Sequence, residues 1–243
     1  MGTNGESVRD AGTGRPSVGS WAVRAVMYVI GIAVLALGVS FSRRAGLGLS
    51  MLVAWPAVMA DIDPNEAHNM GWYVGAVFVL YVLLEIIVLR REFKPIQLLQ
   101  VPISLMYGSL VNLWNGVSSA IPVPNYLAQV ALTLLSVLTM AIGISIYLTA
   151  DVVPLSSEGI VLAVAKVSGR PFPKLKQAFD LTLIVLALVT SIIGLHEVRY
   201  VREGTILAAL CLGPLIGATG RFVGPVIRRI CFGSTDKDAT SLA

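Results

Sequence analysis

Two acidic residues of this chain stand beside serines in a short run between apolar stretches. Asp151 precedes Val-Val-Pro-Leu, and Ser156, Ser157 and Glu158 follow directly. A serine can cap the start of a helix, and a carboxylate in the first turn suits the helix dipole. A carboxylate within a membrane can also bind a proton or a cation. We therefore interpret Asp151 and Glu158 as candidate ion-coupling residues, with plain helix capping by Glu158 as the alternative.

A related run occurs in the first half of the chain, where it has a serine but no acid. The two runs are Ala45-Gly46-Leu47-Gly48-Leu49-Ser50 and Asp151-Val152-Val153-Pro154-Leu155-Ser156, and they follow the Gly-x-Ser steps Gly38-Val39-Ser40 and Gly143-Ile144-Ser145. Each run leads into an apolar piece, 49–60 or 155–166, that is too short to cross a bilayer. Interrupted short segments at matching places in two halves are typical of transporter binding sites. Ser50, Ser156 and Ser157 are therefore candidate substrate-binding residues.

A third polar set lies in the apolar stretch 96–117. At about 100° per residue, one helix face would carry Gln97, Gln100, Ser104 and Asn115, with Asn112 about 60° away. Such side chains are costly in hydrocarbon and indicate either a water-filled path or hydrogen bonds that hold helices together. Gln100, Asn112 and Asn115 join the candidate substrate-binding residues, whereas Gln97 is interpreted as the end of the helix.

Two further acids lie in apolar stretches close to basic residues. Asp180 follows Lys176 at the four-residue spacing that pairs side chains on a helix. Glu85 is deeper, and Arg90 and Arg91 follow it. The sequence predicts an ion pair for both acids, and it leaves Glu85 open to a functional role.

The composition is that of a membrane protein with several α-helical crossings. Hydrophobic residues make up 56% of the chain and charged residues 13%, and the mean hydropathy is +0.79. Runs of about 20 apolar residues are long enough to span a bilayer. Six crossing helices are predicted, at about 21–41, 71–89, 96–117, 126–149, 178–195 and 204–227. The two short apolar pieces are left over as broken or re-entrant half-helices.

The distribution of Lys and Arg predicts that both termini are cytoplasmic. The predicted organisation is a disordered cytoplasmic tail over 1–20, a first transmembrane repeat over 21–124, a second over 125–230, and a cytoplasmic tail over 231–243. Three crossings per repeat would invert the second repeat relative to the first. Arg43 and Arg44 then fall on the outer side, where they would either attract an anion or extend to the membrane interface.

Other classes of function find no support in the sequence. His68 and His196 both fall in predicted outer loops, the two cysteines have no metal-type spacing, and no hydrolase, metalloprotease or nucleotide-binding motif is present. We therefore expect no enzymatic activity, no cofactor or metal, and no nucleic-acid partner. The expected surroundings are the lipid bilayer and a small solute, and the small residues between Gly213 and Gly220 would pack either within the chain or between copies in a homo-oligomer.

Several motifs together resemble the YczE/YyaS/YitT group of bacterial integral membrane proteins. The similar pieces are 45–50, 92–100, 154–159, 174–180, and 202–205 leading to Gly213-Pro214. Met51 follows Ser50 where that group often has proline. The resemblance covers about residues 25–230 and implies a bacterial inner-membrane protein, but no general activity.

From the repeat and the buried polar residues we expect a secondary transporter or channel-like carrier of a small polar or charged solute. The alternative is a non-transporting membrane protein that supports a partner enzyme or pump.

Overall fold

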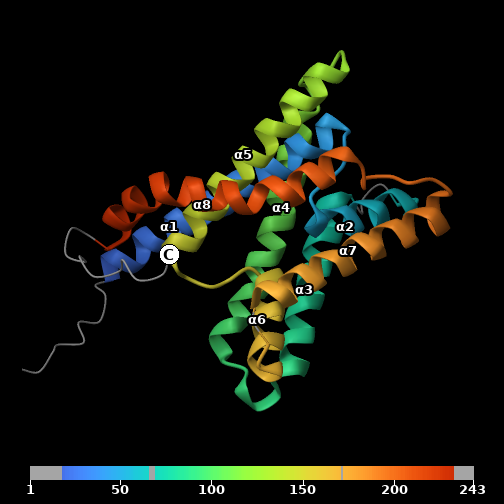
Figure 1. Cartoon of the computed structure of the whole chain (residues 1–243). Helices are drawn as coiled ribbons and strands as arrows, with labels where there is room; N and C mark the ends of the chain where they lie inside the picture. The colour runs from blue at the N-terminus through green and yellow to red at the C-terminus, as the bar shows by residue number, and fades with distance from the viewer. Residues whose placement is uncertain (1–17, 66–68, 171, 233–243) are drawn as a thin grey trace, which may run out of the picture.

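The computed structural model describes residues 18–65, 69–170 and 172–232, and the described part is helical throughout apart from its connecting segments. Six helices are long and apolar enough to cross a membrane, as predicted. They are α1 (Val18–Ala45), α3 (Met70–Leu89), α4 (Gln100–Ser118), α5 (Tyr126–Ala150), α7 (Phe172–Leu195) and α8 (Glu203–Phe232) (Figure 1). Most of the two predicted tails, residues 1–17 and 233–243, lies outside the described residues.

The two predicted half-helices are the short helices α2 (Met51–Ile62) and α6 (Ser156–Ser168). Two 3-10 turns, η1 (Arg90–Glu92) and η2 (Pro95–Leu99), connect α3 to α4. Residues 46–50 join α1 to α2, and residues 151–155 join α5 to α6, so the two linkers have the same length. The sequence comparison that paired Ser50 with Ser156 is therefore wrong by one position, because Ser50 precedes α2 whereas Ser156 is the first residue of α6.

Glycines allow α1 and α5, which make the largest helix contact, to pack with their backbones close together. A Cβ atom at Gly31 would lie 2.6 Å from the Tyr147 backbone nitrogen, and one at Gly143 would lie 2.5 Å from that of Leu35. Helices α3 and α4 meet in the same way, since a Cβ at Gly71 would lie 2.0 Å from the Gly108 carbonyl oxygen.

The short helices pack against long helices of the opposite half of the chain. Helix α2 lies along α7, where the Trp55 indole donates to Thr190 Oγ1 at 3.2 Å. Helix α6 lies along α3, and at its end Lys166 forms an ion pair with Glu92 at 2.7 Å. Figure 1 shows α2 beside α7 and α6 beside α3. Each short helix thereby buries one side against protein rather than lipid.

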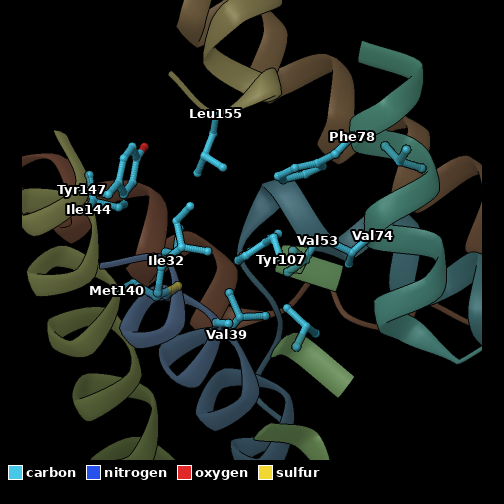
Figure 2. Packing of buried hydrophobic residues seen from close by; sticks show 14 of the residues in the cluster. Ile32, Val39, Val53, Val74, Phe78, Tyr107, Met140, Ile144, Tyr147 and Leu155 are labelled. Carbon is cyan, nitrogen blue, oxygen red and sulfur yellow. The ribbon is translucent and has the colours of Figure 1, made fainter. Parts of the chain in front are cut away.

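A continuous apolar core joins these helices near their centre (Figure 2). Phe78 of α3 stacks on Tyr107 of α4 with 5.2 Å between ring centroids. Leu155, which precedes α6, enters the same cluster. The outward faces are apolar as well, and Phe222 of α8 is 80% exposed, which suits a surface that meets lipid rather than water.

Contacts between loops define the two ends of the bundle. At the end that we name the Asp61 end, Arg44 donates to the Ile121 carbonyl at 2.7 Å, and Arg199 pairs with Asp61 at 3.1 Å. At the end that we name the Glu92 end lies the Lys166–Glu92 ion pair. Helices α2 and α6 therefore start from buried residues and run towards different partners at their C-terminal ends.

Candidate functional site

The start of α6 gathers buried polar side chains from three helices. Gln100 at the start of α4 is 1% exposed, and neither atom of its amide makes a hydrogen bond of acceptable geometry within the described chain. Ser104, one turn further, has its hydroxyl 3.3 Å from the hydroxyl of Ser156. The Ser157 hydroxyl is fully buried and has no partner among the described residues. The structure thus brings Gln100 and Ser156, both predicted, to one place.

Glu85 of α3 belongs to the same cluster, although the sequence predicted an ion pair for it. The side chain is 1% exposed; one carboxylate oxygen accepts from the Gln97 amide, and the other makes no hydrogen bond of acceptable geometry in the described part. The predicted ion pair with Arg90 or Arg91 is wrong, because no ion pair joins these residues where the structure describes them. An acid within an otherwise apolar stretch indicated that Glu85 has a special role. The arginines that follow it in the sequence, however, suggested a simple ion pair.

Gly159 brings Glu85 and Gln100 together. A Cβ atom at this position would lie 2.6 Å from Glu85 Oε2, 2.9 Å from Gln100 Oε1 and 3.0 Å from Gln100 Nε2. Both side chains therefore touch the backbone of α6 at a residue that has no side chain of its own. We name Glu85, Gln100, Ser104, Ser156 and Gly159 the α6 cluster.

Glu158 of α6 contacts α5. Its Oε1 accepts a 2.6 Å hydrogen bond from the Tyr147 hydroxyl. Figure 2 shows the Tyr147 hydroxyl on the side of Leu155. The carboxylate also interacts with the Leu155 backbone, so the capping alternative keeps its support. The edge of the Tyr28 ring meets the Tyr147 ring at a centroid distance of 6.0 Å. Glu158 is thus a membrane-embedded carboxylate that joins the start of α6 to a tyrosine of α5.

Asp151 does not join Glu158, although both belong to one short run of the sequence. It ends α5 in a left-handed conformation, with φ at 48°, and its side chain is 87% exposed. Arg24 Nη2 lies 3.5 Å from its carboxylate, and the same guanidinium donates to the Ala150 carbonyl at 2.9 Å. The structure therefore gives Asp151 the role of closing a helix end with Arg24.

The two asparagines of α4 lie far from Gln100. Asn112 accepts from the Gly71 backbone N–H at 2.7 Å, and the Asn115 amide lies 3.7 Å from the Met70 sulfur. At a rise of about 1.5 Å per residue, Asn115 is about 22 Å along α4 from Gln100. The asparagines and Gln100 therefore do not form one site, although the sequence placed them on or near one helix face. Asn112 instead holds α4 against the first turn of α3.

Ser50 precedes α2 and is buried. Its backbone carbonyl accepts from the N–H groups of Val53 and Ala54, each at 3.0 Å, while its hydroxyl does not cap the helix. Among the described residues no hydrogen bond links Ser50 to another candidate residue. The predicted Lys176–Asp180 ion pair, in contrast, is confirmed.

The Asp61 end holds a cavity of about 380 Å³ between the first linker and the segment 196–202. Arg43, Arg199 and Arg202 line it together with Glu197. Asp61 accepts from Tyr200 at 2.6 Å and pairs with Arg43 at 3.7 Å and with Arg199. Burial raises the pKa of the Tyr200 hydroxyl to about 12. These arginines are neutralised by carboxylates. The anion site that the sequence suggested at Arg43 therefore gains no support.

Comparison with known proteins leads to a family and not to an activity. No curated protein and no solved structure resembles the chain significantly. The profile of a family of unknown function, DUF6198, matches residues 22–221. The chain therefore belongs to this family of unknown function, as a membrane protein with six apolar spans and two short helices packed between them.

Proposed function

We propose that this protein is a secondary transporter or channel-like carrier of a small polar or charged solute in a bacterial inner membrane. The observation that carries the proposal is the α6 cluster, where Glu85 and Gln100 are fully buried and have polar atoms that make no hydrogen bond of acceptable geometry within the described chain. Unpaired buried polar atoms are costly, and within membrane segments they mark substrate and ion pathways.

An inverted internal repeat supports the proposal. The pairs of packed helices correspond when α1, α2, α3 and α4 are matched with α5, α6, α7 and α8: α2 packs on α7 as α6 packs on α3, and α1 packs on α4 as α5 packs on α8. The correspondence is incomplete, since α3 packs closely on α4 whereas α7 and α8 make little contact. Inverted repeats with interrupted helices are a common architecture of secondary transporters.

The glycine contacts between α1 and α5 show the same reciprocity. If the ends of the two linkers are matched, Gly38 corresponds to Gly143 and Gly31 to Ser136. A Cβ at Gly38 would lie 2.9 Å from the Ser136 carbonyl oxygen, and one at Gly143 would lie 2.8 Å from that of Gly31. A two-fold axis between α1 and α5 accounts for both contacts.

The charge distribution supports an orientation with both termini in the cytoplasm. The Glu92 end carries Arg90, Arg91, Lys94 and Lys166, whereas acids offset the arginines of the Asp61 end. Because short cytoplasmic loops are enriched in Lys and Arg, we place the Glu92 end inside. We also propose kinship with the YczE/YyaS/YitT group, on the motifs named above, and no enzymatic activity.

The alternative, an accessory protein that supports a membrane partner, is favoured by α8. A Cβ atom at Gly213 or Gly217 of this helix would meet no atom of the described chain within 4 Å, so a smooth glycine face meets the lipid. Small-residue faces of this kind allow another helix to approach closely. A homo-oligomer would use the same face.

A thermal-shift screen of the purified protein against a broad panel of small solutes tests the carrier proposal. A ligand at 100 times its Kd stabilises a protein by about 2.7 kcal/mol, so a specific solute should raise Tm clearly. The solute identified is then used for uptake into vesicles. We expect Gln100→Leu to reduce uptake by roughly tenfold or more, a change that corresponds to about 1.4 kcal/mol. The lipid-facing control Ser109→Ala should leave uptake unchanged.

Co-purification separates the two functions. A stable membrane partner, found together with the absence of any solute that shifts Tm, would favour the accessory role and contradict the carrier.

A further inference from the structure

We propose that Glu85 is a proton-binding residue, and that Gln100 holds its carboxyl group in both the protonated and the ionised state. The proton site itself stands on the geometry of the α6 cluster. Its use for coupling rests on the carrier function proposed above.

The contact of Glu85 and Gln100 with α6 leaves no room for a larger ligand at Gly159. A single methyl group at Gly159 would already lie 2.6 Å from Glu85 Oε2 and 2.9 Å from Gln100 Oε1. A solute or a hydrated ion cannot fit between these atoms. A bare hard cation would need about six or more oxygen ligands, and the described residues form no cluster of acidic, histidine or cysteine side chains that could hold a metal. The ligand that fits between the Glu85 carboxylate and Gly159 is therefore a proton.

The charges near Glu85 favour binding of that proton. No cation in the described chain pairs with its carboxylate. Lys166 pairs with Glu92 and Lys176 pairs with Asp180, and within the described chain no ion pair joins Arg90, Arg91 or Lys94 to Glu85. A buried carboxylate without a counter-ion takes up a proton rather than staying charged.

The other groups that face Glu85 are neutral or turned away. From α4 the group is Gln100, and from α6 it is the backbone of Gly159. Tyr81, one turn before Glu85 on α3, is a buried phenol that carries no charge at neutral pH. The second acid of α6, Glu158, accepts a hydrogen bond from Tyr147 of α5. Glu85 is therefore the carboxyl group that titrates at the Gly159 contact.

Gln100 is suited to both charge states because its amide has a donor end and an acceptor end. The two ends lie at nearly the same distance from the Gly159 Cβ position, 3.0 Å for Nε2 and 2.9 Å for Oε1. A protonated Glu85 would donate to Oε1, and an ionised Glu85 would accept from Nε2. A half-turn of the amide exchanges the two arrangements without moving a helix.

Gln97 connects the site to the Glu92 end. It donates to Glu85 Oε1, and its own amide oxygen accepts from the Lys94 backbone N–H at 2.7 Å. Gln97 is half-buried and Lys94 is exposed, so this contact leads from the buried acid to the surface. The Gln97 amide cannot itself pass on the proton, because its nitrogen only donates, so we infer that Gln97 marks the side from which water would exchange a proton with Glu85.

Infrared difference spectroscopy of the purified protein across a pH titration tests the proton site without requiring transport. We expect a carboxylic acid C=O band of the wild-type protein that is missing in Glu85→Gln, and that persists in the control Glu92→Gln, whose acid is exposed on the same side. Gln100→Met should shift the frequency of this band, because the polar amide that interacts with the acid is replaced by an apolar side chain. The Gln100 variant keeps the test decisive if Glu85→Gln fails to fold.

The site assignment would be overturned by a folded Glu85→Gln protein with the wild-type carboxyl spectrum. It would also be overturned if the band had the same frequency in Gln100→Met as in the wild type. Coupling is measured separately, as pH change inside vesicles during uptake of the solute found in the thermal-shift screen. A Glu85 band together with solute uptake that moves no protons would refute coupling and leave the carrier function standing. A Glu85 band in a protein that takes up no solute would refute the carrier function and leave the proton site standing.

Discussion

Gly159 makes the α6 cluster possible, since every other residue type would put atoms where Glu85 and Gln100 lie. We predict that Gly159→Ala destabilises the protein by about 1–3 kcal/mol, the usual cost of overpacking. The measurement is the thermal unfolding of the purified variant in detergent. Gly213→Ala is the matched control, because open space surrounds that helical glycine, and alanine there should leave Tm unchanged or raise it. Equal Tm values for the wild type and Gly159→Ala would contradict the tight packing.

The Tyr147–Glu158 hydrogen bond gives a second prediction for single residues. Removing the hydroxyl with Tyr147→Phe takes a 2.6 Å hydrogen bond from a buried carboxylate, which costs about 1–3 kcal/mol. Glu158→Gln should cost less, since a neutral amide can still accept from Tyr147. A double-mutant cycle of these two changes, followed by thermal unfolding, should show that their effects do not add. Strict additivity would mean that the two side chains do not depend on each other.

Single residues also show where sequence reasoning stops. Ser156 and Gln100 could be singled out because polar side chains stand out in apolar stretches. The sequence could not show that Glu85 lies beside Ser156 and Gln100. Its approach to Gly159 depends on the packing of α3 against α6, and these two helices belong to different halves of the chain. Asn115 shares a helix face with Gln100, but periodicity reports direction around a helix and not distance along it.

At the scale of helices, the contact of α3 with α4 rests on Gly71 and Gly108. We predict that Gly71→Ala loosens this pair and lowers Tm, because a Cβ would lie 2.0 Å from a backbone oxygen that cannot move aside. The expected loss is about 1–3 kcal/mol. Gly116→Ala on α4 is the control, since nothing in the described chain lies within 4 Å of its Cβ position. The prediction fails if both variants unfold at the wild-type temperature.

The helices themselves were largely predictable. Six apolar stretches of membrane length and two short ones correspond to α1 to α8. The structure adds the residues that cap α3 and α5, Asn69 and Asn125, which the sequence analysis did not identify. The starts of α2 and α6 were less certain because Gly48 and Pro154 interrupt the pattern without fixing the first helical residue. Which long helix receives each short helix was not predictable, since that choice lies in packing across the two halves.

For the whole molecule, the proposed orientation, with α7 crossing the membrane, predicts opposite exposure of two surface positions. With both native cysteines replaced, Asp151→Cys should react with an impermeant thiol reagent only from the cytoplasmic side, and Glu197→Cys only from outside. Both parent side chains are exposed, at 87% and 51%. Labelling of intact cells and of inverted vesicles provides the measurement. Reaction of both cysteines from the same side would exclude the proposed topology.

The proposed repeat also shows how unequal the two halves have become. When the linker ends are matched, Glu85 corresponds to Thr190 and Gln100 to Thr205. Thr190 accepts from Trp55, and Thr205 donates to the Tyr200 carbonyl at 2.8 Å, so both threonines are neutral and satisfied. In the described chain, the polar cluster at α6 therefore has no counterpart with an acidic residue at the start of α2.

The packing of α2 on α7 has a consequence for the order in which the protein can be assembled. The ribosome completes α2 long before it reaches α7, the helix with which α2 makes its largest contact. Until then, the short helix and its linker lack the neighbour that covers them, in a solvent where uncovered backbone is costly. Helix α6, in contrast, emerges when its partner α3 is already in place. Biogenesis should therefore be most vulnerable in the first half of the chain, which has to wait for the second.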